Sequence, residues 1–416
     1  MLLHRRYYRR YGFLLFFILL SGPLSAQNNA LWVWNTRQII DQPEWRDSLR
    51  SVTLQFRINT LFLYLSYDIS DNGDTVVLYK RDSLISLLSW ARSQSLSVHA
   101  LAGEPEWALR SNHNRPLAFA REVIALHKET GMPDGIQFDI EPYLLLPFSV
   151  PQTKKQLIND WINGVWKTGK LIREESSLIY GIAVPFWMED TITIEKMTMP
   201  IGKHLSFLTD YLAIMAYRSK AEGSASVISF SEKELEWAKS AHRKIYIGIE
   251  TIRLGGSTTN YLCEVDPLLF SEKIDQTFGD YEDYRFRRKK ISVEMVGGKM
   301  LLGVSGDDYT VKELTDLRKG LIESFDGKEI SVPAQTLAAE VKKSERLESL
   351  TEVILDDGST ALKVVTEELR QSTMYHLTKD EFFREYYTLL RFAEQHEEVE
   401  GIAIHHLKSV RKFLLQ

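Results

Sequence analysis

Two carboxylic acids in the stretch "DGIQFDIEPY" (134–143) have the types and spacing of a catalytic pair. Side chains alternate along a β-strand, so Gln137, Asp139 and Glu141 would share one face while apolar residues take the other. Two such carboxyls repel each other when both are ionised, and burial disfavours the charged form, so one can keep its proton near neutral pH and act as a general acid. The alternative is that the two acids are structural ion-pair partners that hold loops in place.

Eight short apolar runs with the length of strands are spaced along the chain. They cover residues 31–36, 60–68, 97–103, 135–143, 179–187, 211–218, 245–251 and 401–407. Amphipathic segments with helical period lie between them, and this alternation is typical of a parallel sheet. Eight repeats predict an α/β fold, a closed (β/α)8 (TIM) barrel. Asp139 and Glu141 would then point inward near the C-terminal end of the fourth strand, where the active sites of barrel enzymes lie.

The interval between the seventh and eighth predicted strands is much longer than the others. It holds two β-rich runs around a Gly-Gly pair, which is a hairpin signal, and a helical pattern over 310–325. We therefore predict an α+β domain inserted after strand 7, at 256–372, and a barrel formed by 27–255 and 373–416. Two separate domains are the alternative, which would leave the barrel without its eighth strand.

The first 26 residues have the composition of a secretory signal peptide. Four arginines precede an apolar run, and small residues follow it up to Ala26. The apolar run has about ten residues, whereas a membrane-spanning helix needs about 20. We expect cleavage after Ala26, export to the periplasm or the medium, and no membrane span in the mature form. An uncleaved membrane anchor is the alternative.

The composition narrows the class of protein. The chain has 416 residues, of which 44% are hydrophobic and 26% charged, as expected of a globular protein with a sizeable core. Its net charge of −5 argues against nucleic acid as a partner. Cys263 is the single cysteine, which rules out an internal disulfide, and no spacing typical of a metal site is present. We expect no metal and no cofactor.

The motif of the fourth predicted strand resembles that of glycoside hydrolase family 18, the chitinases and endo-β-N-acetylglucosaminidases. The family pattern is D-x-x-D-x-D-x-E, which "DGIQFDIE" matches at Asp134, Asp139 and Glu141 but not at Gln137. Many members of this family also carry an α+β insertion after strand 7, at the place where the long interval lies here.

Two other strands match the family only in part. The strand-6 pattern Met-x-Tyr-Asp is matched by Met215 and Tyr217, whereas Arg218 replaces the aspartate. On strand 8, His406 stands about where the family has a tryptophan that forms the floor of the sugar site. Together with Gln137, these departures favour one alternative function, a glycan-binding barrel that no longer turns over substrate.

The resemblance implies a glycan substrate containing N-acetylglucosamine and a mechanism assisted by the substrate. Glu141 would protonate the leaving oxygen, and the 2-acetamido group of the sugar would attack the anomeric carbon. Asp139 would orient that group and stabilise its positive charge, and Tyr217 would donate a hydrogen bond to its oxygen. This mechanism is an exception to the usual scheme with two carboxylates.

A third carboxylate leaves a second mechanism open. Glu250 on the seventh strand shares a face with Tyr246, so it could be the nucleophile of a retaining glycosidase in which Glu141 is the acid and base. It could equally be a structural partner of Arg218 or Arg253.

Aromatic residues gather at the ends of the predicted strands, where their faces could stack on sugar rings. We predict substrate contacts for Trp34, Trp107 and Trp187, the alternative being packing in the core. The other predicted substrate contacts are Tyr143, Glu250, Arg218 and His406.

Overall fold

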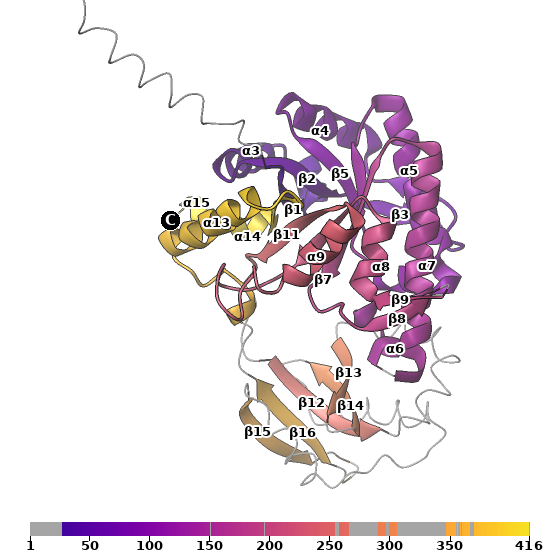
Figure 1. The fold of residues 1–416 in the computed structure, drawn as a ribbon, viewed down its shortest axis with the longest axis vertical. Coiled ribbons are helices and arrows are strands. Elements are labelled where there is room, and N and C mark those ends of the chain that lie inside the picture. The colour runs from indigo at the N-terminus through magenta and orange to yellow at the C-terminus, as the bar shows by residue number, and fades with distance from the viewer. Residues whose placement is uncertain are drawn as a thin grey trace, which may run out of the picture.

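The computed structural model describes residues 27–149, 151–194, 196–253, 258–265, 290–296, 299–305, 347–354, 360–366 and 370–415, together with Asp356 and Gly358. Within them, eight parallel strands close into a barrel in the order β1-β17-β11-β10-β7-β6-β5-β2 (Figure 1). The strands are β1 (Asn29–Val33), β2 (Ile58–Tyr64), β5 (Ser97–Ala102), β6 (Gly135–Phe138), β7 (Ile179–Pro185), β10 (Tyr211–Met215), β11 (Lys244–Glu250) and β17 (Val399–His405). The predicted (β/α)8 barrel is therefore confirmed.

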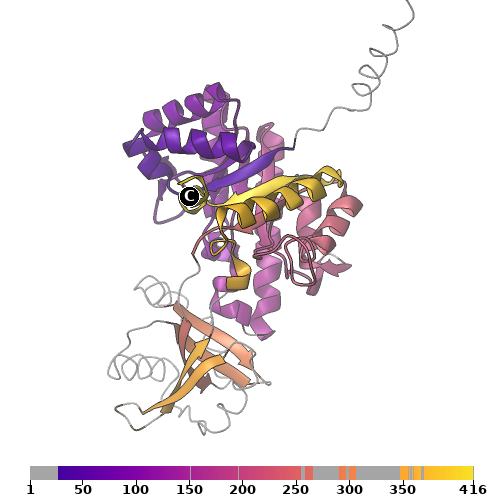
Figure 2. The ribbon, with the colours of Figure 1, turned by 90° about the vertical axis from the view of Figure 1, so that its left-hand side faces the viewer.

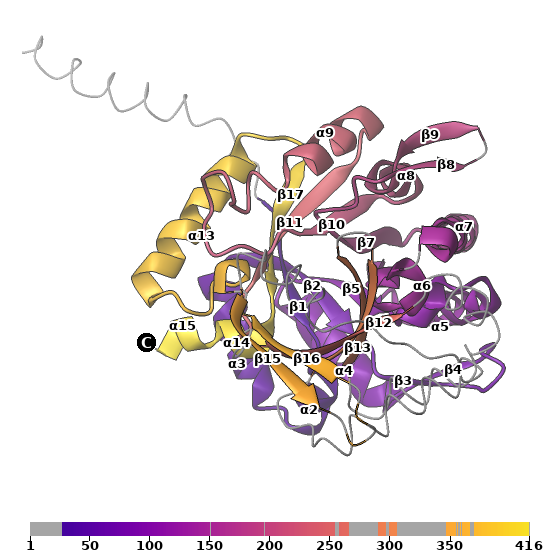
Figure 3. The same ribbon diagram turned by 90° about the horizontal axis from the view of Figure 1, so that it is seen from below.

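Helices surround the barrel, as the view along it shows (Figure 3). They are α2 (Thr36–Asp41), α3 (Trp45–Gln55), α4 (Arg81–Ser93), α5 (Asn114–Thr130), α6 (Leu146–Ser149), α7 (Pro151–Glu175), α8 (Ile201–Leu208), α9 (Glu232–Ala241), α13 (Lys379–Glu394), α14 (Leu407–Val410) and α15 (Lys412–Leu415). Each longer helix turns an apolar stripe toward the strands. In α13, for example, Phe382, Tyr386 and Leu389 are buried, and a capping box of Thr378 and Glu381 starts the helix.

Short elements complete the loops of the barrel. Two hairpins pair β3 (Tyr67–Ile69) with β4 (Val76–Leu78) and β8 (Thr191–Ile194) with β9 (Met197–Pro200). Single 3-10 turns are η1 (Pro105–Ala108), η2 (Arg110–Asn112), η3 (Pro142–Leu144) and η4 (Arg370–Ser372).

A second sheet comes from the sequence between β11 and α13, and it lies outside the barrel wall (Figure 2). Its strands are β12 (Thr258–Val265), β13 (Lys290–Val296), β14 (Lys299–Ser305), β15 (Leu347–Ile354) and β16 (Thr360–Thr366), which pair antiparallel in the order β13-β14-β12-β16-β15. The predicted helix at 310–325 lies outside the described residues, and the domain boundaries of 256–372 stay a prediction.

Hydrogen bonds clamp the two barrel segments that flank this second sheet. The Met374 N–H donates to the Glu250 carbonyl at 2.8 Å, and the Thr373 hydroxyl donates to the Ile252 carbonyl at 2.7 Å. The chain therefore leaves the barrel at the end of β11 and returns to it at almost the same point.

The barrel interior is filled by alternating small and aromatic side chains. The inner cluster consists of Ala30, Trp32, Phe62, Leu101, Ala183, Tyr211, Ala213, Tyr246 and Ala403. A Cβ on Gly181 would overlap the ring of Tyr211, so the absence of a side chain there makes room for an aromatic ring. With this interior packed, side chains that act on a ligand must lie at an end of the barrel.

Candidate active site

Asp139 and Glu141 directly follow β6, at the C-terminal end of the barrel. The Asp139 N–H donates to the Ala102 carbonyl at 2.9 Å, which extends the pairing with β5 by one residue before η3 begins. A Cβ on Gly103 would overlap the Asp139 backbone, so the two strand ends approach closely here because Gly103 lacks a side chain. The strand thus delivers both carboxyls to the mouth of the barrel.

The carboxyl of Asp139 is shielded from water. Its Oδ1 is buried and has no hydrogen-bond partner among the described residues. Burial, and then the nearby Glu141, raise the pKa of Asp139 well above its usual value. A pair of interacting carboxyls in this state shares one proton and titrates as a unit.

Glu141 lies beside an aromatic group at the mouth. The Tyr143 hydroxyl donates a hydrogen bond to Glu141 Oε1. The ring of Tyr143 meets that of Trp187 edge-on, with centroids 5.0 Å apart, and Trp187 remains 40% exposed. Burial, and then Glu141, raise the pKa of Tyr143, so its hydroxyl stays a neutral donor. The structure therefore brings the predicted contacts Tyr143 and Trp187 to the predicted acid.

Tyr217 lies two residues beyond β10 and close to all three candidate carboxylates. Burial raises its pKa well above the usual value, and Glu250, Asp139 and Glu141 raise it further. In the barrel order β10 lies between β6 and β11, so Tyr217 follows a strand that stands between the one before the two acids and the one that ends in Glu250. The three predicted catalytic residues are thus brought together.

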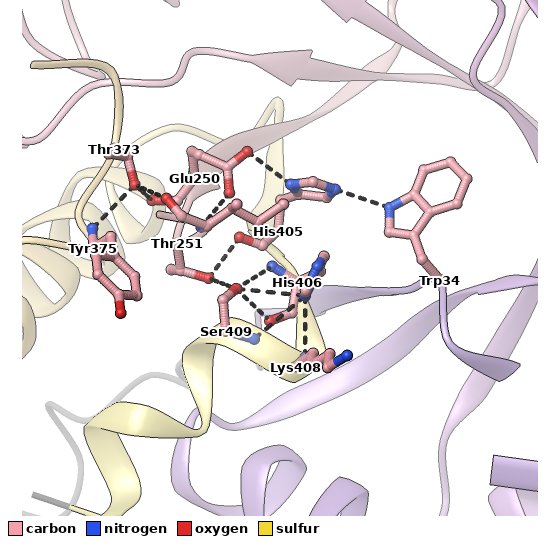
Figure 4. A network of polar contacts seen from close by, with 10 residues as sticks. Trp34, Glu250, Thr251, Thr373, Tyr375, His405, His406, Lys408 and Ser409 are labelled. Carbon is pink, nitrogen blue, oxygen red and sulfur yellow. Dashed lines mark hydrogen bonds and ion pairs between the residues drawn. The ribbon is translucent and has the colours of Figure 1, made fainter. Parts of the chain in front are cut away.

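A chain of hydrogen bonds runs from Glu250 to Trp34 through His405 (Figure 4). Glu250 Oε2 lies 2.8 Å from His405 Nδ1, and Glu250 Oε1 accepts a bond of 2.6 Å from the Ile252 N–H. At the other edge of the imidazole, Nε2 accepts from the Trp34 Nε1–H at 2.9 Å. The imidazole also stacks on Tyr217, with centroids 5.9 Å apart and planes at 20°. Glu250 is therefore held by His405 rather than by Arg218 or Arg253.

The histidine of the site is His405, whereas the sequence pattern pointed to His406. Strand alternation could have found it, because His405 shares a face of β17 with Ala403, a member of the inner cluster, whereas His406 lies beyond the end of the strand. His406 Nδ1 accepts from the backbone N–H groups of Lys408 and Ser409, so His406 caps α14. The predicted position of His406 on the floor of the site is wrong, and His405 lies against Trp34 and Tyr217.

Two other predicted contacts differ from expectation. Trp107 is only 2% exposed and packs against Tyr67, Phe119 and Phe138, so it belongs to the core and the prediction of a sugar contact there is wrong. Arg218 lies next to Tyr217 and donates to its carbonyl at 2.7 Å. The guanidinium of Arg218 covers the rings of two phenylalanines, 4.0 Å from the centroid of Phe230 and 4.8 Å from that of Phe186.

The other two polar residues of the strand-4 motif, Gln137 and Asp134, have structural partners. Gln137 is fully buried, accepts a bond of 2.8 Å from Trp32 Nε1–H and donates to the Tyr211 hydroxyl at 3.3 Å. Asp134 Oδ2 accepts from the Val98 N–H at 2.8 Å, at the opposite end of the strand. Gln137 is neutral, so the charged neighbour that raises the pKa of Asp139 is Glu141.

Other features of the described residues bear on what the site can do. Among them, no group of three or more His, Cys, Asp or Glu side chains could hold a metal ion, and no helix has the length and hydropathy to cross a membrane. A cavity of about 450 Å³ opens at the N-terminal end of the barrel, lined in part by Asp210, Lys244 and Glu400. It lies at the other end from Asp139 and Glu141.

Comparisons with known proteins show no family for this chain. No model of a protein family matches the sequence, and no curated protein matches it. Solved structures similar to this chain include a chitinase from Chromobacterium violaceum, with 12% identity, a TM-score of 0.41, and 94% of this chain and 100% of that chain covered. The spore cortex-lytic enzyme SleL of Bacillus megaterium has 14% identity and a TM-score of 0.40, and the match covers 93% of this chain and 72% of that chain. A family 18 chitinase from Flavobacterium johnsoniae has 11% identity and a TM-score of 0.39, and the match covers 93% of each chain. Function is therefore inferred from the residues of the site.

Proposed function

We propose that the protein is a glycoside hydrolase that cleaves a glycan containing N-acetylglucosamine, and that it is exported before it acts. The observation that carries the proposal is the carboxyl pair of Asp139 and Glu141 at the C-terminal mouth of the barrel, with Tyr217 beside it. The raised pKa of Asp139 gives this pair one proton to share, which an acid catalyst needs. The resemblance of the strand-4 motif to family 18 supplies the class of sugar.

In the proposed mechanism the nucleophile is the 2-acetamido group of the sugar. Glu141 donates a proton to the glycosidic oxygen as the bond from that oxygen to the anomeric carbon breaks. The acetamido carbonyl oxygen bonds to the same carbon and forms a cyclic oxazolinium ion. Water then attacks this carbon, Glu141 takes up the proton, and the ring reopens with net retention of configuration. Tyr217 donates to the acetamido oxygen throughout.

The unpartnered Oδ1 of Asp139 has a place in this scheme. An acetamido N–H is a donor, and a donor that binds a carboxylate favours its ionised form. Binding of substrate at Oδ1 would therefore shift the shared proton from Asp139 to Glu141, which is the group that must deliver it. The ionised Asp139 would then balance the positive charge of the oxazolinium ion.

The scheme in which Glu250 is the nucleophile has less support. Both oxygens of Glu250 already accept hydrogen bonds, from His405 and from the Ile252 N–H. A glycan-binding barrel without turnover is supported by the neutral Gln137, which replaces an acid of the family motif.

The proposal is tested with the chain that begins at Gln27. Aryl glycosides of N-acetylglucosamine oligomers and the matching glucosides are assayed with wild type, Glu141→Gln and Glu174→Gln. Glu174 is an exposed acid on α7 and serves as the matched control. We expect turnover of the N-acetyl substrates alone, a loss of at least about 100-fold in Glu141→Gln, and no change in Glu174→Gln. Equal rates for wild type and Glu141→Gln would refute the proposal, and binding without any turnover would favour the binding barrel.

A further inference from the structure

The hydrogen-bond chain from Trp34 to Glu250 has only one arrangement of protons that satisfies every atom. An indole Nε1–H can only donate, so His405 Nε2 must be the unprotonated nitrogen of the ring. The proton of the neutral imidazole then lies on Nδ1 and is donated to Glu250 Oε2. The other oxygen of Glu250 accepts from the Ile252 N–H. Two donors face the two oxygens, so the arrangement requires an ionised carboxylate.

The imidazole of His405, at the middle of this hydrogen-bond chain, contacts both Tyr217 and Trp34. One face stacks on Tyr217, and the ring of Trp34 meets its edge with centroids 6.3 Å apart and planes at 82°. The side chain of His405 is 16% exposed and that of Glu250 only 4%, so the polar links are largely dry and their geometry is well defined. Strand pairing aligns the two residues as well, because Glu250 and His405 are direct partners between β11 and β17.

We propose that His405 is a positioning residue and that Glu250 acts through it, by fixing the imidazole that orients the indole of Trp34 and stacks on Tyr217. This role deepens the proposed function, on which it rests for its ligand, since Trp34 would be a wall of the sugar site. The hydrogen-bond chain itself exists without a ligand. The prediction is distinct from nucleophilic catalysis, because Glu250 would influence binding through Trp34 and would form no bond to sugar.

Substitution of Glu250 by Gln discriminates between these roles. A carboxamide presents one acceptor and one donor, whereas both partners of Glu250 are donors. The Ile252 N–H can only donate, whereas the imidazole can change its tautomer, so the amide oxygen turns to the Ile252 N–H. His405 must then move its proton to Nε2, where it meets the indole N–H of Trp34. In His405→Phe an aromatic ring remains but both nitrogens are lost. Both variants should therefore release the Trp34 indole.

The first experiment reads Trp34 directly and needs no glycan. In protein with ¹⁵N-labelled tryptophan, the Nε1–H signal of Trp34 is assigned by its loss in Trp34→Phe. In Glu250→Gln and in His405→Phe this signal should move upfield and its hydrogen should exchange with water at least about tenfold faster, as a freed donor does. The signal of Trp45, whose Nε1–H bonds to Gln42 elsewhere, should stay in place in folded variants. An unchanged Trp34 signal in both variants would overturn the inference.

The second experiment measures binding and turnover of an N-acetylglucosamine oligomer. We expect Glu250→Gln and His405→Phe each to raise KM about 5- to 20-fold with a smaller change in kcat, and the double variant to be no worse than the poorer single one. If either variant fails to fold, Trp34→Phe removes the same bond from its other end and takes its place in the cycle. A loss of about 10⁴-fold in kcat for Glu250→Gln, with the Trp34 signal unmoved, would identify a nucleophile and refute the positioning role. A moved Trp34 signal in a protein that neither binds nor cleaves glycans would refute the proposed function and leave the hydrogen-bond chain intact.

Discussion

Glu234 is a buried acid outside the candidate site, and its ionisation should lower the stability of the whole protein. It lies on α9, is 1% exposed, and neither of its carboxyl oxygens has a hydrogen-bond partner among the described residues. Burial raises its pKa from 4.5 to about 8. The folded protein therefore keeps a proton on Glu234 over a range of pH in which the unfolded chain releases it.

The sign and size of the effect follow from this difference in proton binding. Between pH 4.5 and 8 the folded state binds more protons than the unfolded state, so stability falls as pH rises. Each pH unit above the unfolded pKa lowers the free energy of unfolding by about 1.4 kcal/mol, which gives about 3 kcal/mol at pH 7. A glutamine has nearly the same shape and never ionises. Glu234→Gln should thus be more stable than wild type by about 3 kcal/mol at pH 7 and equal to it near pH 4.

Urea unfolding of wild type and Glu234→Gln at several pH values measures this difference directly. Glu232 lies two residues away on the exposed side of α9, so Glu232→Gln is the matched control and should follow the wild type at every pH. A difference between Glu234→Gln and wild type that does not change between pH 4 and pH 8 would refute the reasoning, because it would show that Glu234 does not titrate between folded and unfolded states.

Three further predictions concern the proposed function. Trp187→Ala should weaken binding of N-acetylglucosamine oligomers by about 1–3 kcal/mol, measured by calorimetry, with little change in thermal stability because the ring is already 40% exposed; an unchanged affinity would rule out a sugar platform at this residue. Asp139→Asn should lose at least about 100-fold in kcat, and a thiazoline mimic of the cyclic intermediate should bind wild type far more tightly than substrate; weak binding of the thiazoline would argue against assistance by the acetamido group. N-terminal sequencing of the exported protein should begin at Gln27, whereas an intact Met1 in the membrane fraction would contradict cleavage of a signal peptide.

The barrel could be predicted from the sequence because its strands alternate with amphipathic helices at regular spacing. Boundaries were less accurate: the predicted strand at 135–143 ends at Phe138 in the structure, since Pro142 begins a 3-10 turn after the two acids. The catalytic candidates could be recognised from the sequence, because Asp139 and Glu141 are acids at the end of a largely apolar run.

Positions that depend on tertiary contacts could not be read in the same way. Trp107 and Trp187 both follow strands, yet one is in the core and the other at the surface, because only the fold decides which ring meets Phe138 and which meets Tyr143. The hydrogen bond between Trp34 and His405 joins residues 371 positions apart, so no local sequence pattern predicts it.

The clamp between the end of β11 and the segment that returns to α13 affects which insertions the barrel can accept at this point. Since Thr373 and Met374 bond to Ile252 and Glu250, the residues between them form a closed loop whose ends are fixed by the barrel. The entropy of closing a loop grows only with the logarithm of its length, so each doubling of a segment of about 120 residues costs about 0.6 kcal/mol. Segments of very different size can therefore be exchanged at this point with little effect on the stability of the barrel. The backbone of Glu250 takes part in the clamp, and its side chain takes part in the hydrogen-bond chain to Trp34. A segment inserted at this point would therefore be attached next to a residue that positions Trp34.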